Sequence, residues 1–257
     1  RHFGWSSVEE LAENGLLTEE EAQILLRGRE FLWQVRYALH TLAGREEDRL
    51  LFDHQRALAR QWGFTDDEKL AVEKFMQVYY RWALAIAQLN ELLLQTFDQA
   101  ILGTDSEDEV EVINDSFEIR NGYIAARRPD LFSERPGALL EVFHLAGSNP
   151  AIKGIAAPTI RLIREHRHLV DDDFRADPAN KALFLAILRC PHRMTRQLRR
   201  MSRYGILGKY LPAFGRIVGQ MQHDLFHTYT VDAHTLQVVE NMRRFLRPES
   251  DERFPVT

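Results

Sequence analysis

Residues 66–102 read DDEKLAVEKFMQVYYRWALAIAQLNELLLQTFDQAIL, and this stretch decides the fold class. It contains no proline or glycine, and its apolar residues recur every three or four positions, which is the period of an α-helix with one buried face. The stripe that must pack on other helices comprises Leu70, Phe75, Val78, Trp82, Ile86, Leu89, Leu93 and Phe97. The stretch therefore predicts one long helix inside a helical bundle.

Signals on either side of this helix agree with a helical protein. Ser7 with Glu10, and Thr18 with Glu21, have the spacing of capping boxes, so helices are expected to begin there. Further helical patterns are expected at 53–62, 136–146, 158–170, 178–189 and 191–204. Strands are predicted only on either side of Asn121-Gly122, where apolar and polar residues alternate. This pair tolerates the positive φ angles of a tight hairpin turn. We expect an all-α fold of about ten helices with one small β-hairpin.

Composition limits the classes of function. The 257 residues contain 45% hydrophobic residues, 33 Lys+Arg against 38 Asp+Glu, and a formal net charge of -5. This mildly acidic balance argues against nucleic acid or a membrane surface as a partner. Cys190 is the only cysteine, which fits a reducing cytoplasm. No apolar run reaches the roughly 20 residues that span a bilayer. Because the first residue is Arg, we expect a piece of a longer protein.

Five segments carry a resemblance to a known family. They are residues 1–4 (RHFG), 32–40 (LWQVRYALH), 48–53 (DRLLFD), 90–95 (NELLLQ) and 217–222 (IVGQMQ), the last running on to His234. With these motifs the chain resembles the bacterial bifunctional PII uridylyltransferase/uridylyl-removing enzymes. The resemblance implies a helical domain at residues 1–217 that follows a nucleotidyltransferase domain. Residues 218–257 would be the connection to, and the first helix of, a truncated HD phosphohydrolase domain.

The resemblance also implies an activity, cofactors and a partner. Such an enzyme transfers UMP from UTP to the PII signal protein in the control of nitrogen metabolism, and hydrolyses the product when glutamine is abundant. UTP and glutamine would bind other domains, and Mg²⁺ or Mn²⁺ would assist the parent enzyme. His234 would be the first metal ligand of an incomplete HD site. We expect the isolated chain to be inactive and to bind no cofactor.

Two short segments that contain acidic residues or a histidine are weaker candidates. His223-Asp224 is a literal His-Asp pair, but it precedes His234, which is the wrong order for the family, so a polar connection is the better interpretation. Residues 171–173 (DDD) could be taken for the carboxylates of a two-metal transferase. They lack the Gly-Ser phosphate loop and the third carboxylate of that pattern, so a structural role is favoured.

Two groups of polar and charged residues remain open between a functional and a structural interpretation. The first could contact the nucleotide at the junction with a transferase domain, or form an ordinary network between helices; it comprises Arg36, Arg49, Asp53, His54 and Gln55. The second could dock an acidic partner or a phosphate, or be a solvated face; it comprises Arg193, Arg196, Arg199, Arg200 and Arg203, and we call it the arginine strip.

Two other functions compete with this interpretation. One is a helical domain like that of the glutamine synthetase adenylyltransferases. The residues that lead up to His234 favour the uridylyltransferases over this alternative. The other is a stand-alone helical adaptor that binds an acidic protein through the arginine strip. The sequence on either side of this segment would separate the three.

Overall fold

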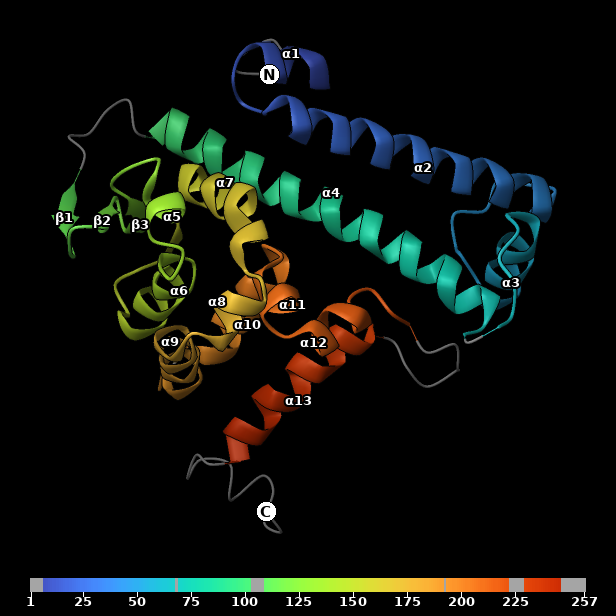
Figure 1. The fold of residues 1–257 in the computed structure, drawn as a ribbon. Helices are drawn as coiled ribbons and strands as arrows, with labels where there is room; N and C mark the ends of the chain where they lie inside the picture. The colour runs from blue at the N-terminus through green and yellow to red at the C-terminus, as the bar shows by residue number, and fades with distance from the viewer. Residues whose placement is uncertain (1–6, 68, 103–108, 192, 222–228, 246–257) are drawn as a thin grey trace. The chain divides into compact units, whose positions relative to one another are not determined.

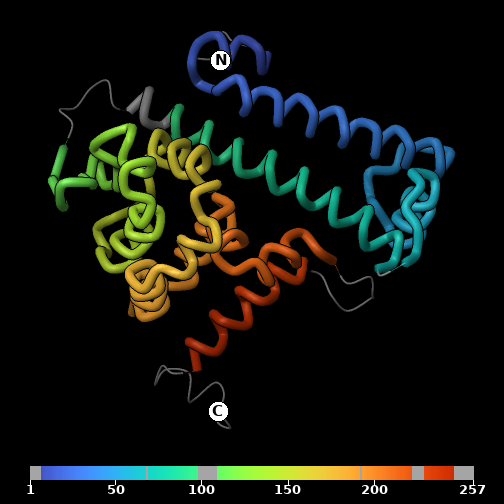
Figure 2. The backbone as a smooth tube through the Cα atoms, viewed as in Figure 1, coloured from blue at the N-terminus to red at the C-terminus, as the bar shows by residue number. Residues whose placement is uncertain are grey.

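The computed structural model describes residues 7–67, 69–102, 109–191, 193–221 and 229–245, and its chain path can be followed in Figures 1 and 2. Helices dominate. They are α1 (Val8–Glu13), α2 (Glu19–Ala43), α3 (Phe52–Gln61), α4 (Ala71–Leu102), α5 (Leu131–Glu134), α6 (Ala138–Ser148), α7 (Ala157–His166), the 3-10 helix η1 (Arg167–Leu169), α8 (Asp172–Ala176), α9 (Pro178–Arg189), α10 (Met194–Arg203), α11 (Ile206–Tyr210), α12 (Pro212–Ile217) and α13 (Val231–Phe245).

The sheet is larger than the expected hairpin. Its four strands, in the order β1-β2-β3-β4, are β1 (Val110–Val112), β2 (Phe117–Arg120), β3 (Tyr123–Ala126) and β4 (Gly154–Ile155). The predicted turn is confirmed, since Asn121 and Gly122 have φ angles of 53° and 83°. The two added strands were not predicted: β1 is exposed throughout, and β4 has only two residues, which pair in parallel with β3.

The described residues also contain more helices than the expected ten. Thirteen α-helices are present, and α5, α8, α11 and α12 are short helices of four to six residues. A helix of one turn and a half does not repeat its apolar face, so periodicity cannot predict it. The long predicted helix is confirmed, although it begins at Ala71, where the backbone amide donates to Asp66 Oδ1.

Local capping explains where several helices begin. The side chains of Ser7 and Thr18 accept hydrogen bonds from the amides of Glu10 and Glu21, and both reciprocal bonds are formed, so the two capping boxes are confirmed. Asp177 caps α9 by accepting from the amide of Ala179. Each cap satisfies amides that a helix start would otherwise leave without a partner.

The chain forms two compact units. The first combines residues 1–99 and 217–233, and the second combines residues 100–216 and 234–257. The chain returns to the first unit at Ile217. The expected division into a helical domain at 1–217 and the start of an HD domain at 218–257 stays a prediction.

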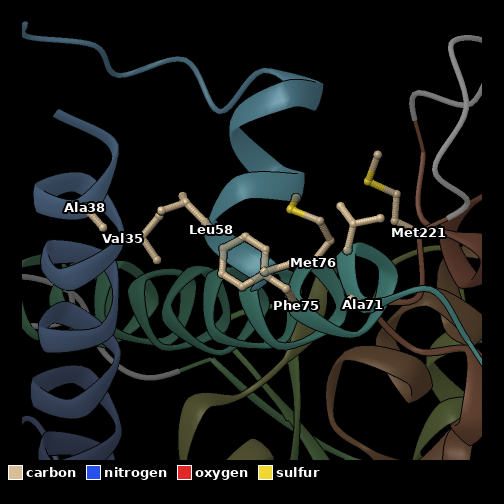
Figure 3. Close-up of a cluster of buried hydrophobic side chains, with 9 residues drawn as sticks. Val35, Ala38, Leu58, Ala71, Phe75, Met76 and Met221 are labelled. Atoms are coloured by element: carbon tan, nitrogen blue, oxygen red, sulfur yellow. The ribbon is translucent and has the colours of Figure 1, made fainter. Parts of the chain in front are cut away.

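The first unit is organised around α4. In Figures 1 and 2 α2 runs alongside α4, and α3 lies at one end of the pair. Figure 3 shows the core there, where Val35 of α2 and Leu58 of α3 meet Phe75 and Met76 of α4. Met221, from the far end of the sequence, completes the same cluster. Burying these side chains supplies the main driving force for packing the three helices.

The second unit packs helices against one another and against the small sheet. Phe117 of β2, Phe132 of α5 and Phe143 of α6 are fully buried. Gly147 lets Cys190 pack closely against α6, because a Cβ at position 147 would lie 2.9 Å from Cys190 Sγ. Nearby, buried Gln197 of α10 donates from Nε2 to the carbonyl of Ala146 over 3.2 Å. No helix in the described ranges has the length and apolar character needed to cross a membrane.

Candidate functional site

The loop between α2 and α3, residues 44–51, is built around one buried carboxylate. Glu47 is only 5% exposed. Its Oε1 accepts hydrogen bonds from the amide and from Nε of Arg49, both at 3.0 Å, and its Oε2 accepts from Arg45 Nη2 at 2.9 Å. The hydrogen bonds from Arg49, with the charge of Arg45, lower the pKa of Glu47 to about 2. We call this segment the α2–α3 loop.

A second carboxylate ties the α2–α3 loop to helix α2. Asp48 Oδ1 accepts from Arg36 Nε at 2.7 Å, and Asp48 Oδ2 accepts from Arg36 Nη2 at 3.2 Å. His40 Nε2 lies 3.3 Å from the same Oδ1. These contacts with Arg36 and then His40 lower the pKa of Asp48. The guanidinium of Arg36 also lies 5.6 Å from the ring centroid of Trp33, so its position is fixed on two sides.

Helix α3 supports the loop from the other side. Gln55 is buried and donates from Nε2 to the carbonyl of Leu50 over 2.8 Å. Gln55 Oε1 and His54 Nδ1 are buried atoms without a hydrogen-bond partner among the described residues. Asp53 is exposed, with its Oδ1 4.0 Å from Arg56 Nη1.

Of the five residues predicted to face a nucleotide, Arg36, Arg49 and Gln55 are therefore joined through one loop. Asp53 and His54 follow in the first turn of α3. The sequence reasoning missed Glu47 and His40. The run of three acidic residues between two arginines at 45–49 (REEDR) was the signal for such an ion-pair network.

Residues 217–221 dock onto helix α4 within the first unit. The carbonyl of Val218 accepts from Gln77 Nε2 at 3.1 Å and from Arg81 Nε at 3.4 Å. Gln220 Oε1 accepts from Lys69 Nζ at 3.1 Å. Gly219 has a φ of 70° and would place a Cβ 3.2 Å from the Arg81 side chain. The positive φ and the short distance to Arg81 explain the glycine at position 219.

Two hydrogen bonds join the first turn of helix α13 to this segment. The amide of Val231 donates to the carbonyl of Gln220 over 2.8 Å, and the amide of Gly219 donates to Asp232 Oδ1 over 3.0 Å. Asp232 lies in the first turn of α13, and its carboxylate bonds this earlier amide. His234 is an exposed residue of the same helix. His223-Asp224 lies outside the described residues.

The arginine strip makes many internal contacts in the second unit. Arg193 Nη1 donates to the carbonyl of Ile152 at 2.7 Å, and Arg196 and Arg200 both donate to the carbonyl of Lys153. Arg199 Nη2 donates to Glu240 Oε2 of α13 at 2.6 Å. Arg203 is the last residue of α10. The strip therefore fixes neighbouring segments as well as presenting charge.

The remaining acidic candidates have a structural role. Asp171 caps the short helix α8, its Oδ1 accepting from the amide of Phe174 at 2.9 Å, and Asp172 pairs with Arg175. Within the described ranges no group of three or more His, Cys, Asp or Glu side chains could hold a metal ion. His234 alone does not fit a catalytic metal, which needs several protein ligands.

Comparison with known families follows the division into two units. Residues 1–94, in the first unit, match the family model described as GlnD PII-uridylyltransferase. Residues 117–210, in the second unit, match the model described as uridylyltransferase GlnD third domain. Both descriptions name uridylyltransferases, so the two matches point to one class of protein. The chain belongs to the GlnD family.

Similar curated proteins agree with the two models. The chain is 52% identical over all of its 257 residues to the bifunctional uridylyltransferase/uridylyl-removing enzymes of Pseudomonas aeruginosa and Azotobacter vinelandii. It is 53% identical to the enzyme of the same description from Nitrosococcus oceani. In each case the chain spans 29% of the relative's length. No solved structure shows a significant match.

Proposed function

We propose that this chain is the helical middle region of an enzyme that transfers UMP from UTP to the PII protein and hydrolytically removes it again. One observation carries the proposal: the two family models match in succession along a chain that is 52% identical throughout to bifunctional uridylyltransferase/uridylyl-removing enzymes. Because the chain spans 29% of such relatives, the remaining length would supply the rest of both active sites.

The α2–α3 loop is the proposed nucleotide-side surface of this region. Glu47 and Asp48 hold Arg49 and Arg36 in place, so the loop does not depend on a ligand for its shape. Arg49 is 72% exposed, and an arginine presents five N–H donors, of which Glu47 engages few. Such a guanidinium suits a phosphate oxygen of UTP.

The arginine strip is the proposed surface for PII. Arg196 is exposed, whereas Arg199 and Arg200 are half-buried and hold other segments. A docking test should therefore change Arg196, which is exposed although it also donates to the carbonyl of Lys153, and leave the half-buried Arg199 and Arg200 unchanged. Arg196→Glu in the complete enzyme should weaken PII binding at low salt, since surface charge acts mainly on association.

The function is tested by comparing this chain with the complete enzyme that contains it. Each is incubated with PII, UTP and Mg²⁺, and separately with uridylylated PII. The complete enzyme should add and remove UMP, while the 257-residue chain should do neither. A complete enzyme that modifies glutamine synthetase and leaves PII unmodified would overturn the proposal, and turnover by the isolated chain would overturn its assignment as a catalytically incomplete region.

A further inference from the structure

The second unit contains a strongly basic cavity away from the α2–α3 loop. It measures about 240 Å³ and lies where α10, α13 and the segment after α9 meet. The charged side chains that line it are Arg193, Arg196, Arg199, Glu240, Arg243 and Arg244. Arginine stays protonated in proteins, so five positive charges face one carboxylate in this cavity.

The single carboxylate is already shared. Glu240 Oε2 accepts from Arg199 Nη2 at 2.6 Å, and Glu240 Oε1 accepts from Arg244 Nη2 at 2.9 Å. Both carboxylate oxygens of Glu240 thus accept hydrogen bonds from arginines that line the cavity. One carboxylate balances one of the five guanidinium charges, so the lining keeps an excess of four positive charges.

The other three guanidiniums bond neutral groups. Arg193 Nη1 donates to the carbonyl of Ile152 at 2.7 Å, and Arg196 Nη2 donates to the carbonyl of Lys153 at 3.2 Å. Arg243 donates to the carbonyls of Leu188 and Cys190, both at 3.0 Å. Carbonyl partners fix the direction of a guanidinium without neutralising its charge. An incoming anion therefore meets donors that have already lost much of their side-chain freedom.

The volume of the cavity and the start of helix α10 limit the kinds of ligand that the cavity can bind. A cavity of about 240 Å³ is smaller than the roughly 300–1,000 Å³ of sites that enclose a whole drug-sized molecule. Met194 and Thr195, the first residues of the ten-residue helix α10, also line it. Free amides and the helix dipole at such a start favour a negative charge, in addition to the arginines.

We propose that this cavity binds a phosphoryl anion, either inorganic phosphate or the phosphate end of a nucleotide whose nucleoside remains outside. Arginine forks recognise phosphate oxygens in a bidentate manner, and the cavity offers several of them at fixed positions. The lining comes from α10, α13 and the turn after α9, so a bound anion joins these segments and stabilises their packing.

Isothermal titration of the 257-residue chain with inorganic phosphate at constant ionic strength tests the proposal. We expect one site, and a melting temperature that rises with phosphate concentration. The variant Arg196→Gln/Arg244→Gln removes two lining charges at exposed positions. It should bind phosphate at least about tenfold more weakly, as loss of charge-assisted hydrogen bonds predicts.

The matched control is Arg189→Gln/Arg203→Gln, which removes the same charge from positions outside the lining. It should retain phosphate affinity within about twofold, since distant surface charges are screened at physiological salt. Circular dichroism checks that both variants fold. Absence of phosphate binding at millimolar concentration, or equal weakening in the two double variants, overturns the proposal.

A second titration, with UMP, separates the two sources of the phosphoryl group. Equal affinity for UMP and phosphate assigns the site to the free anion, and clearly tighter binding of UMP assigns it to a nucleotide. An acidic protein segment is the rival occupant. If a polyglutamate peptide binds the cavity and phosphate does not compete with it, the cavity is a protein-docking surface and the proposal is wrong.

Discussion

Arg199 of α10 donates a hydrogen bond of 2.6 Å from Nη2 to Oε2 of Glu240 on α13, 41 residues further along the chain. The same guanidinium reaches Gln237 Oε1 at 2.9 Å, one helical turn earlier. Through this pair the arginine strip holds the last described helix against the body of the second unit.

We expect a measurable coupling between Arg199 and Glu240. In a double-mutant cycle with Arg199→Ala and Glu240→Ala, the coupling free energy of unfolding should be about 1 kcal/mol, the upper end for partly exposed ion pairs. Arg244 pairs with Glu240 within α13 and should couple by only about 0.3–0.5 kcal/mol. Urea unfolding followed by circular dichroism measures both. A larger coupling for Arg244 than for Arg199 would contradict the assignment.

Glu47 should make stability depend on pH. Its folded pKa of about 2 lies below the usual 4.5, so its contribution is fully present above pH 4.5 and is lost as the pH falls towards 2. Glu47→Gln should therefore lower the melting temperature at pH 7, and the gap to the wild type should narrow below pH 4.5. Glu46→Gln, an exposed neighbour, controls for the charge change. A gap that widens on acidification would refute the role of Glu47.

Gly219→Ala should destabilise the chain more than an alanine at another left-handed glycine. Gly219 has a φ of 70°, and a Cβ there would also meet Arg81 Cγ at 3.2 Å and Gln77 O at 3.3 Å. Gly63 has a φ of 78° with nothing within 4 Å, so Gly63→Ala measures the backbone cost alone, about 1 kcal/mol. We expect roughly 2 kcal/mol for Gly219→Ala because the contact adds to this cost. Equal losses in thermal or urea unfolding would show that the contact with α4 is unimportant.

His234 should affect one activity of the complete enzyme and spare the other. If His234 is the first metal ligand of the hydrolase, as the family resemblance implies, removal of UMP from PII should require it and addition of UMP should not. His234 is exposed on α13, so His234→Ala should leave the melting temperature nearly unchanged. His168→Ala, another exposed histidine of the second unit, should retain both activities. Deuridylylation at the wild-type rate by His234→Ala would remove His234 from the metal site.

The sequence by itself determined the long helices and, at the two capping boxes, where a helix begins. The stripe from Phe75 to Leu93, the capping boxes at Ser7 and Thr18, and the Asn121-Gly122 turn are local signals, because each depends on residues within a few positions of one another. Elements that depend on distant residues were not predicted. Strand β4 forms only because β3 offers a parallel partner, and the short helices are stabilised by burial, as with Phe174 in α8.

Tertiary structure alone decided which charges meet. Nothing within residues 45–49 shows that Glu47 is buried or that Asp48 reaches back to Arg36. The return of Met221 to the core beside Phe75, and the gathering of arginines from α10 and α13 around Glu240, join residues far apart in sequence. Periodicity records which side of a helix is buried. It does not record which helix lies opposite, and the charge, burial and pKa of a side chain depend on that neighbour.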